Sequence, residues 1–110
     1  MKAVRISRGI IMAEYHCVEV NNVFAIMKME AGGLILAEVK TDKETKEKYY
    51  PTRAIYSSEL NLVADLINLS VKRGVYLKTI TSIGEVMKES HRIAELGQQA
   101  LNQLNNETEL

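Results

Sequence analysis

Residues 18–36, VEVNNVFAIMKMEAGGLIL, place two sharp turns between three short apolar runs, and this stretch decides how the chain folds. The first turn is Asn21-Asn22, because asparagine tolerates the positive φ that two-residue hairpin turns require. The second is Gly32-Gly33, since glycine has no Cβ to oppose a left-handed backbone. The runs show no clear 3.6-residue period, so they predict antiparallel strands joined in a meander.

The same pattern extends to both sides of this stretch. Residues 2–56 are therefore predicted to form one antiparallel meander of four to five strands, with a charged connector over 42–47. The last run, residues 48–55, contains Pro51, which has no N–H to donate to a sheet ladder. We expect that strand to lie at an edge of the sheet or to be bulged.

Beyond residue 56 the apolar side chains recur at helical spacing and predict a largely buried helix over 58–73. Ser57 or Ser58 supplies an N-cap, because a serine hydroxyl accepts from the free amides of the first turn. Gly74 follows a cationic last turn and is expected to end the helix in a left-handed conformation.

A second, long helix is predicted over about 83–104, after a short strand or extended linker over 75–80. Ser82 and Glu85 stand at the spacing of a capping box, in which each side chain accepts from the other's backbone amide. Residues 105–110 are polar and are expected to fray. The fold class is thus α+β: an N-terminal meander followed by two helices in a single domain over residues 1–110.

Composition excludes several classes of protein. A chain of 110 residues with 46% hydrophobic and 25% charged residues is typical of one globular domain. Its 14 Lys and Arg balance 14 Asp and Glu, so it lacks the basic excess of a dedicated nucleic-acid binder. DNA or RNA is therefore not expected as the main partner.

No targeting or membrane segment is predicted. Lys2, Arg5 and Arg8 resemble the basic start of a signal peptide, but only residues 10–13 follow as an apolar stretch. The other apolar runs fall short of the roughly 18 residues of a membrane span. A cytoplasmic location is expected.

The sequence offers little to a catalytic or metal centre. Cys17 and His16 would point to opposite faces of one strand, and no paired Cys or His spacing of a zinc site occurs. His91 is expected on the solvated edge of the second helix beside Glu95. We therefore expect a non-catalytic protein without metal or cofactor. A small enzyme that uses Cys17, His16 or His91 is the less favoured alternative.

Arginine and tyrosine side chains supply the candidate ligand-binding residues. Guanidinium groups hold phosphate or carboxylate, and flat aromatic rings stack on bases. Ordinary solvated side chains are the alternative interpretation of the same residues. The β half contributes Arg5, Arg8, Tyr15, Tyr49, Tyr50, Arg53 and Tyr56, and the helical half contributes Arg73 and Arg92.

The second helix carries a stripe of apolar and small residues that predicts a close helix contact. We interpret the stripe as the interface of a homodimer or higher oligomer, although the pattern leaves open packing within the subunit. The predicted interface comprises Ile83, Val86, Met87, Ser90, Ile93, Ala94, Gly97, Ala100, Leu101 and Leu104.

These features together predict a homo-oligomeric binding or inhibitor protein that captures a small anionic, nucleotide-like ligand. The alternative is a protein-protein adaptor or inhibitor that takes no small ligand. The order of elements resembles small phage proteins that inhibit host defence, including some that sequester cyclic nucleotide signals. That resemblance is one of architecture and assigns no role to any residue.

Overall fold

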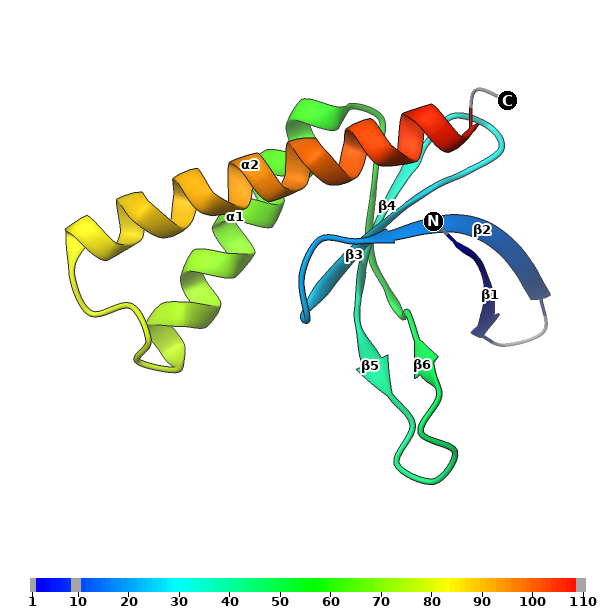
Figure 1. Cartoon of the computed structure of the whole chain (residues 1–110), viewed down its shortest axis with the longest axis horizontal. Helices are drawn as coiled ribbons and strands as arrows, with labels where there is room; N and C mark the ends of the chain where they lie inside the picture. The colour runs from blue at the N-terminus through cyan, green and yellow to red at the C-terminus, as the bar shows by residue number, and fades with distance from the viewer. Residues whose placement is uncertain (1, 9–10, 109–110) are drawn as a thin grey trace.

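The computed structural model describes residues 2–8 and 11–108, and within these ranges it describes residues 2–8, 11–15 and 107–108 by their backbone alone. Its elements follow the predicted order, with strands first and two helices after them (Figure 1). The strands are β1 (Lys2–Arg8), β2 (Ile11–Glu19), β3 (Phe24–Lys28), β4 (Leu34–Glu38), β5 (Lys40–Thr41), β6 (Lys48–Tyr49) and β7 (Thr52–Tyr56). The helices are α1 (Glu59–Tyr76) and α2 (Ile83–Thr108). The predicted α+β class is confirmed.

Five of the strands form one antiparallel sheet in the order β1-β2-β3-β4-β7, which is the predicted meander. The turn after β2 closes differently from the prediction, because Asn21 does not have a positive φ. Its Oδ1 instead accepts from the amides of Val23 and Phe24, each at 2.9 Å. In the next turn only Gly32 is left-handed, with φ of 97°.

The predicted last strand is split in two at Pro51. β6 ends before this residue and pairs with β5 in a separate two-stranded ribbon, which projects away from the helices (Figure 1). β7 begins after it and forms an edge of the main sheet, with a shift in register between Leu36 and Ala37. The expected edge position and bulge are both confirmed.

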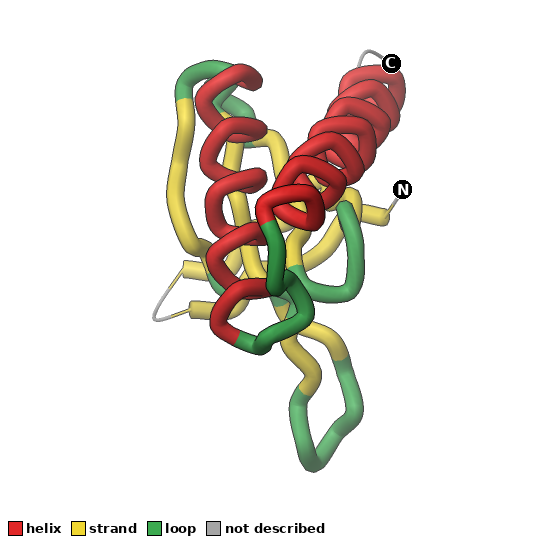
Figure 2. The backbone as a smooth tube through the Cα atoms, turned by 90° about the vertical axis from the view of Figure 1, so that its left-hand side faces the viewer, coloured by secondary structure: helices red, strands yellow, loops and turns green. Residues whose placement is uncertain are grey.

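Both helices pack on one face of the sheet (Figure 2). Alternate residues of β2, β3 and β4 point into this layer, because successive strand side chains face opposite ways. Leu62 and Leu66 of α1 are fully buried there, but the buried residues of this helix are only these two with Ser70 and Gly74, and Leu60 is 79% exposed. The prediction of a largely buried first helix is therefore wrong. The sheet contributes Val18, Val20, Phe24, Ile26, Leu34 and Leu36, and the other face carries a smaller cluster of Cys17, Ala25, Met27, Ile35 and Ala37.

The first helix begins as predicted but does not end as predicted. Ser58 is the N-cap, and its Oγ accepts from the Asn61 amide at 3.1 Å. Gly74 is not a left-handed stop: it lies inside α1, and a Cβ there would overlap the side chain of Ile80. The chain reverses instead at Lys78, with φ of 63°, so the strand or linker predicted over 75–80 is wrong.

The second helix opens with the predicted capping box. Ser82 Oγ accepts from the Glu85 amide at 3.1 Å, while the Glu85 carboxylate accepts from the Thr81 amide at 2.8 Å. The helix continues to Thr108, so the fraying expected from residue 105 is wrong. Asn105 is held by its Nδ2, which donates to Glu59 Oε2 at 3.0 Å.

The close contact predicted by the small residues of α2 lies within one chain. A Cβ on Gly97 would stand 3.3 Å from Leu66 and 3.5 Å from Val63, where α2 passes over α1 (Figure 1). Ile93, Ala100, Leu101 and Leu104 are buried in the same core, so these four and Gly97 are occupied inside the subunit.

The rest of the predicted interface divides into two groups. Val86, Ser90 and Ala94 are half-buried. Ile83 and Met87 are 78% and 67% exposed, so the predicted self-association can use these two. In the described part of the chain, neither helix combines the length and apolar character needed to span a bilayer.

Candidate anion-binding site

A cavity of about 160 Å³ lies where the second half of α1, the α1–α2 loop and α2 meet the turn between β2 and β3. The two helices bring together segments that are distant in sequence, and the turn closes one side. We call this space the first hollow. Its lining is Asn21, Val23, Phe24, Ser70, Arg73, Gly74, Leu77, Thr79, Glu89 and Arg92.

Ser70 is a buried polar residue in the wall of the first hollow. It is only 6% exposed, and its Oγ has no hydrogen-bond partner in the described part of the chain. A serine inside a helix often donates to the carbonyl four residues earlier. Ser90 of α2 does so, with its Oγ 2.8 Å from Val86 O. Ser70 Oγ therefore has unused hydrogen-bonding capacity in the wall of the hollow.

Arg73 stands one turn after Ser70 on α1, and residues spaced by three share a helix face. Its side chain is exposed, and no carboxylate in the described residues forms an ion pair with it. A guanidinium without an acidic partner keeps all five N–H donors for a ligand.

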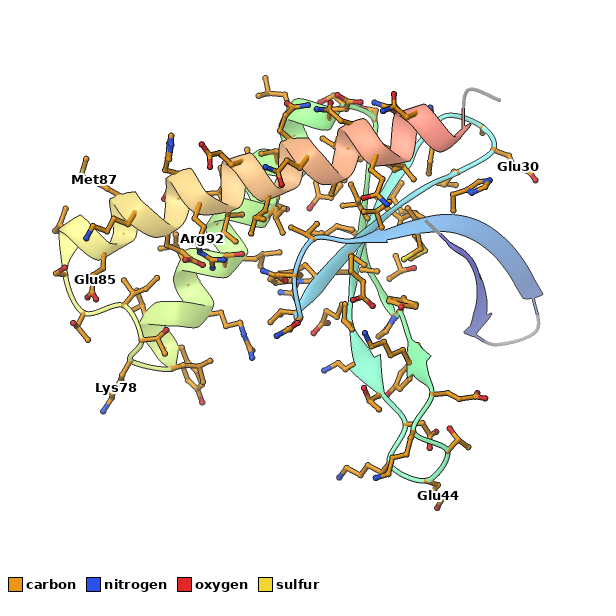
Figure 3. The ribbon with its side chains drawn as sticks, in the orientation of Figure 1. Glu30, Glu44, Lys78, Glu85, Met87 and Arg92 are labelled. Carbon is orange, nitrogen blue, oxygen red and sulfur yellow. The ribbon has the colours of Figure 1, made fainter. Side chains whose placement is uncertain are left out.

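Arg92 reaches the first hollow from α2 and is held by Glu89. Its Nε donates to Glu89 Oε1 at 3.0 Å, and its Nη2 lies 2.8 Å from both carboxylate oxygens. These bonds leave the two N–H donors of Nη1 for another acceptor. Figure 3 shows Arg92 between the two helices. Glu89 thus positions a planar guanidinium without using its whole donor set.

The charge of the first hollow favours an anion. Arg73 and Arg92 bring two positive charges and Glu89 brings one negative charge, so the lining carries a net positive charge. Planar guanidinium forks match the oxygens of phosphate and carboxylate, and such charge-assisted bonds are about twice as strong as neutral ones.

The candidate residues of the β half whose side chains are described do not line the first hollow. The hydroxyl of Tyr50 donates to Glu19 Oε2 at 2.8 Å, and Tyr56 donates to Asp65. Arg53 lies 3.7 Å from Glu38, and Tyr49 is exposed on β6. The side chains of Arg5, Arg8 and Tyr15 lie outside the described residues. Of the six candidates whose side chains the structure describes, it brings Arg73 and Arg92 together in the first hollow.

Sequence reasoning missed two residues of this site. Ser70 stands among Leu66, Ile67, Leu69 and Val71, and a lone hydroxyl in such an apolar stretch was a signal that could have been followed. Glu89 gave no such signal, because its role depends on the Arg92 rotamer.

The alternative catalytic residues are not arranged for nucleophilic chemistry. Burial, with a smaller contribution from the charge of Glu19, raises the pKa of Cys17 to about 12, so the thiol stays protonated at neutral pH. His16 is exposed on the opposite face of β2. His91 lies on the exposed surface of α2 with its Nε2 3.3 Å from Glu95 Oε1, as predicted. The described residues contain no group of His, Cys, Asp and Glu side chains fit for a metal ion.

The fold and the hollow define a two-layer α+β protein with a small cationic cavity beneath its helical pair. The chain belongs to the family described as "Domain of unknown function (DUF5405)", whose model matches residues 13–105. The matched range includes every residue that lines the first hollow.

A relative from Escherichia phage P2 is 41% identical over 85 residues, which cover 77% of this chain and 85% of the relative. That protein is described as "Uncharacterized 11.3 kDa protein in GpA 5'region". No solved structure matches the chain. Kinship with a phage protein agrees with the resemblance expected from the order of elements, and an inhibitory role stays a prediction.

Proposed function

We propose that the protein is a non-catalytic binding protein that holds a small anionic ligand in the first hollow. The observation that supports this most is the Ser70 hydroxyl, which is buried without a hydrogen-bond partner among the described residues and lines the same hollow as two guanidinium groups. A buried polar group that makes no hydrogen bond costs about 1–3 kcal/mol, and such groups are rare in folded proteins. A bound acceptor would remove that penalty.

The donors around the first hollow suit an acceptor-only ligand. Ser70 offers one O–H, Arg73 offers its whole fork, and Arg92 offers Nη1. Phosphate and carboxylate groups carry only acceptors when ionised, so each of their oxygens can meet one of these donors. A cation would face two guanidinium groups and gains nothing from the same lining.

The lining of the first hollow supplies donors that can hold an anion, and holding a ligand is the action that we propose. A protein that binds one ligand per chain lowers the free concentration of that ligand in proportion to its own amount. We therefore propose sequestration of a small anion as the biological action, which keeps the inhibitor function predicted from the sequence.

Binding of inorganic phosphate, measured by isothermal titration calorimetry, tests this function. We expect the wild-type protein to bind phosphate saturably, and Arg73→Gln to weaken the binding at least tenfold, because it removes the unpaired guanidinium. Lys72→Gln is the matched control: it removes an exposed charge next to Arg73 that does not line the hollow. Equal affinity in all three proteins would refute the proposed site.

A protein-protein adaptor or inhibitor remains the second candidate, and one observation favours it. Large apolar side chains lie exposed at the loop end of the helical pair, where Figure 3 shows Lys78 and Met87. Soluble proteins seldom expose such patches unless they dock a partner. The exposed residues are Val75, Tyr76 and Leu77 of the α1 end and Ile83 and Met87 of α2.

A further inference from the structure

A second cavity of about 210 Å³ adjoins the first hollow. Three residues line both cavities: Thr79 of the α1–α2 loop and Glu89 and Arg92 of α2. The ion pair between Arg92 and Glu89 therefore forms a wall that is common to both cavities. We call the second cavity the second hollow, and its remaining lining is Ile80, Glu85 and Lys88.

The second hollow has a different chemical character from the first. Lys88 adds a positive charge and Glu85 a negative one, so these two residues together add no net charge to the second hollow. A hydrogen bond from the Thr81 backbone amide lowers the pKa of Glu85, which keeps its carboxylate ionised at neutral pH. An ionised carboxylate repels a second anionic group, while Ile80 adds an apolar surface.

We propose that the ligand is a phosphate monoester of a nucleoside, with its phosphate in the first hollow and its uncharged part in the second. This inference rests on the proposed anion-binding function and names the class of ligand. A nucleobase edge carries both donors and acceptors, whereas a phosphate carries acceptors alone. The second hollow offers both partners, the ammonium of Lys88 and the carboxylate of Glu85, whose Oε1 accepts from Thr81 and Ser82 and whose Oε2 is the oxygen left for a ligand.

The shared wall supports the same assignment. Three hydrogen bonds to Glu89 hold the Arg92 guanidinium in one orientation. A guanidinium fixed in this way is a flat surface on which a base can stack, as arginine planes do in RNA-binding proteins. Arg92 can thus bind the phosphate through Nη1 and support the base through its plane, which joins the two halves of one ligand.

Calorimetric titration of the wild-type protein with a set of defined probes tests the ligand class. The probes are inorganic phosphate, pyrophosphate, ribose 5-phosphate and the four nucleoside 5′-monophosphates. We expect at least one nucleotide to bind ten times more tightly than phosphate and than ribose 5-phosphate. Pyrophosphate should bind no more tightly than phosphate, because its second charged group would meet both Lys88 and Glu85, whose charges cancel.

Two variants test whether the second hollow causes the tighter binding of a nucleotide than of phosphate. Lys88→Gln removes the ammonium of the second hollow, so it should bring the nucleotide affinity down towards that of phosphate while the phosphate affinity changes by less than threefold. Lys78→Gln is the matched control, because Lys78 is an exposed lysine of the α1–α2 loop that lines neither hollow. It should leave both affinities unchanged.

The outcomes separate this inference from the proposed function. If phosphate, ribose 5-phosphate and every nucleotide bind equally, and Arg73→Gln weakens them all, anion binding stands and the nucleotide assignment is overturned. Tighter binding of pyrophosphate than of any nucleotide overturns the assignment as well. If none of the probes binds, the proposed function itself is refuted and the inference falls with it.

Discussion

Ser70→Ala should make the ligand-free protein more stable, which is unusual for a change at a buried position. The Oγ atom is buried without a partner in the described part of the chain, so the folded state carries its full desolvation penalty. The unfolded chain does not, since water satisfies the hydroxyl there. Deleting the group removes the penalty and leaves the surrounding apolar contacts in place.

Two contributions should raise the free energy of unfolding of Ser70→Ala. An unpaired buried hydroxyl costs about 1–3 kcal/mol. Alanine also exceeds serine in helix propensity by up to about 0.7 kcal/mol. Ser90→Ala is the matched control for propensity, because Ser90 lies within α2 and its Oγ donates to Val86 O. The difference between the two variants should be about 1–3 kcal/mol in favour of Ser70→Ala.

Urea denaturation in buffer free of phosphate measures both variants. A gain of 1 kcal/mol raises the melting temperature by about 4 °C or more in a domain of this size, so thermal melts provide a second readout. In saturating phosphate the stability advantage of Ser70→Ala over wild type should shrink or reverse, because the wild type binds the ligand more tightly. A ligand at 100 times its Kd adds about 2.7 kcal/mol to the stability of the protein that binds it. If Ser70→Ala is less stable than wild type without ligand, the hydroxyl is satisfied and our reasoning about the first hollow is wrong.

Three further predictions follow from the packing and the surface. Gly74→Ala should lower the free energy of unfolding by about 1–3 kcal/mol, since its Cβ would overlap Ile80; Gly84→Ala, whose Cβ meets nothing nearer than 3.9 Å, is the control and should be neutral or stabilising. The stability of the protein should fall as pH rises above about 9, because the pKa of the Cys17 thiol is about 9.0 in the unfolded chain and burial raises it to about 12 in the folded protein. Urea midpoints at pH 8 and pH 10 measure this loss, and a Cys17→Ala variant that loses as much would contradict it. Met87→Glu should lower the mass of any oligomer in light scattering while the melting temperature stays near that of wild type, and an unchanged oligomer mass would remove α2 from the interface.

The fold was predictable where local chemistry decides the structure. The strands end at turns or breaks that the sequence marks with Asn21, Gly32 and Pro51. The Ser82–Glu85 capping box starts a helix by local hydrogen bonds alone. Even so, the prediction had the wrong mechanism at Asn21, where a side-chain oxygen caps the turn in place of a left-handed backbone. Both kinds of turn favour asparagine, so the residue type cannot show which of the two forms.

Tertiary contacts decide the features that the sequence did not predict. Gly74 follows a lysine and an arginine, as a helix-ending glycine often does, yet it serves as the place where Ile80 packs on α1. Gly97 signalled a close contact correctly, but periodicity cannot tell whether the neighbouring helix belongs to the same chain.

In the candidate site, too, the residue types were predictable from the sequence, whereas their arrangement depends on tertiary contacts. Arginine and tyrosine were recognisable as ligand-binding types, and two of them, Arg73 and Arg92, do line one cavity. The reversal at Lys78 brings these two together, and no local pattern predicted it. That Ser70 lacks a partner is a fact of packing, because it depends on every atom that surrounds the hydroxyl.

The ribbon of β5 and β6 offers a way to tether the protein without touching either hollow. Its tip is closed by its own bonds: Asp42 Oδ1 accepts from the amides of Glu44 and Thr45 at 2.8 and 2.9 Å. The ribbon projects away from both helices (Figure 1), and exposed loop tips tolerate insertions well. A biotin-acceptor peptide inserted at this end of the ribbon would immobilise the protein on a sensor surface with its helical end facing the solution.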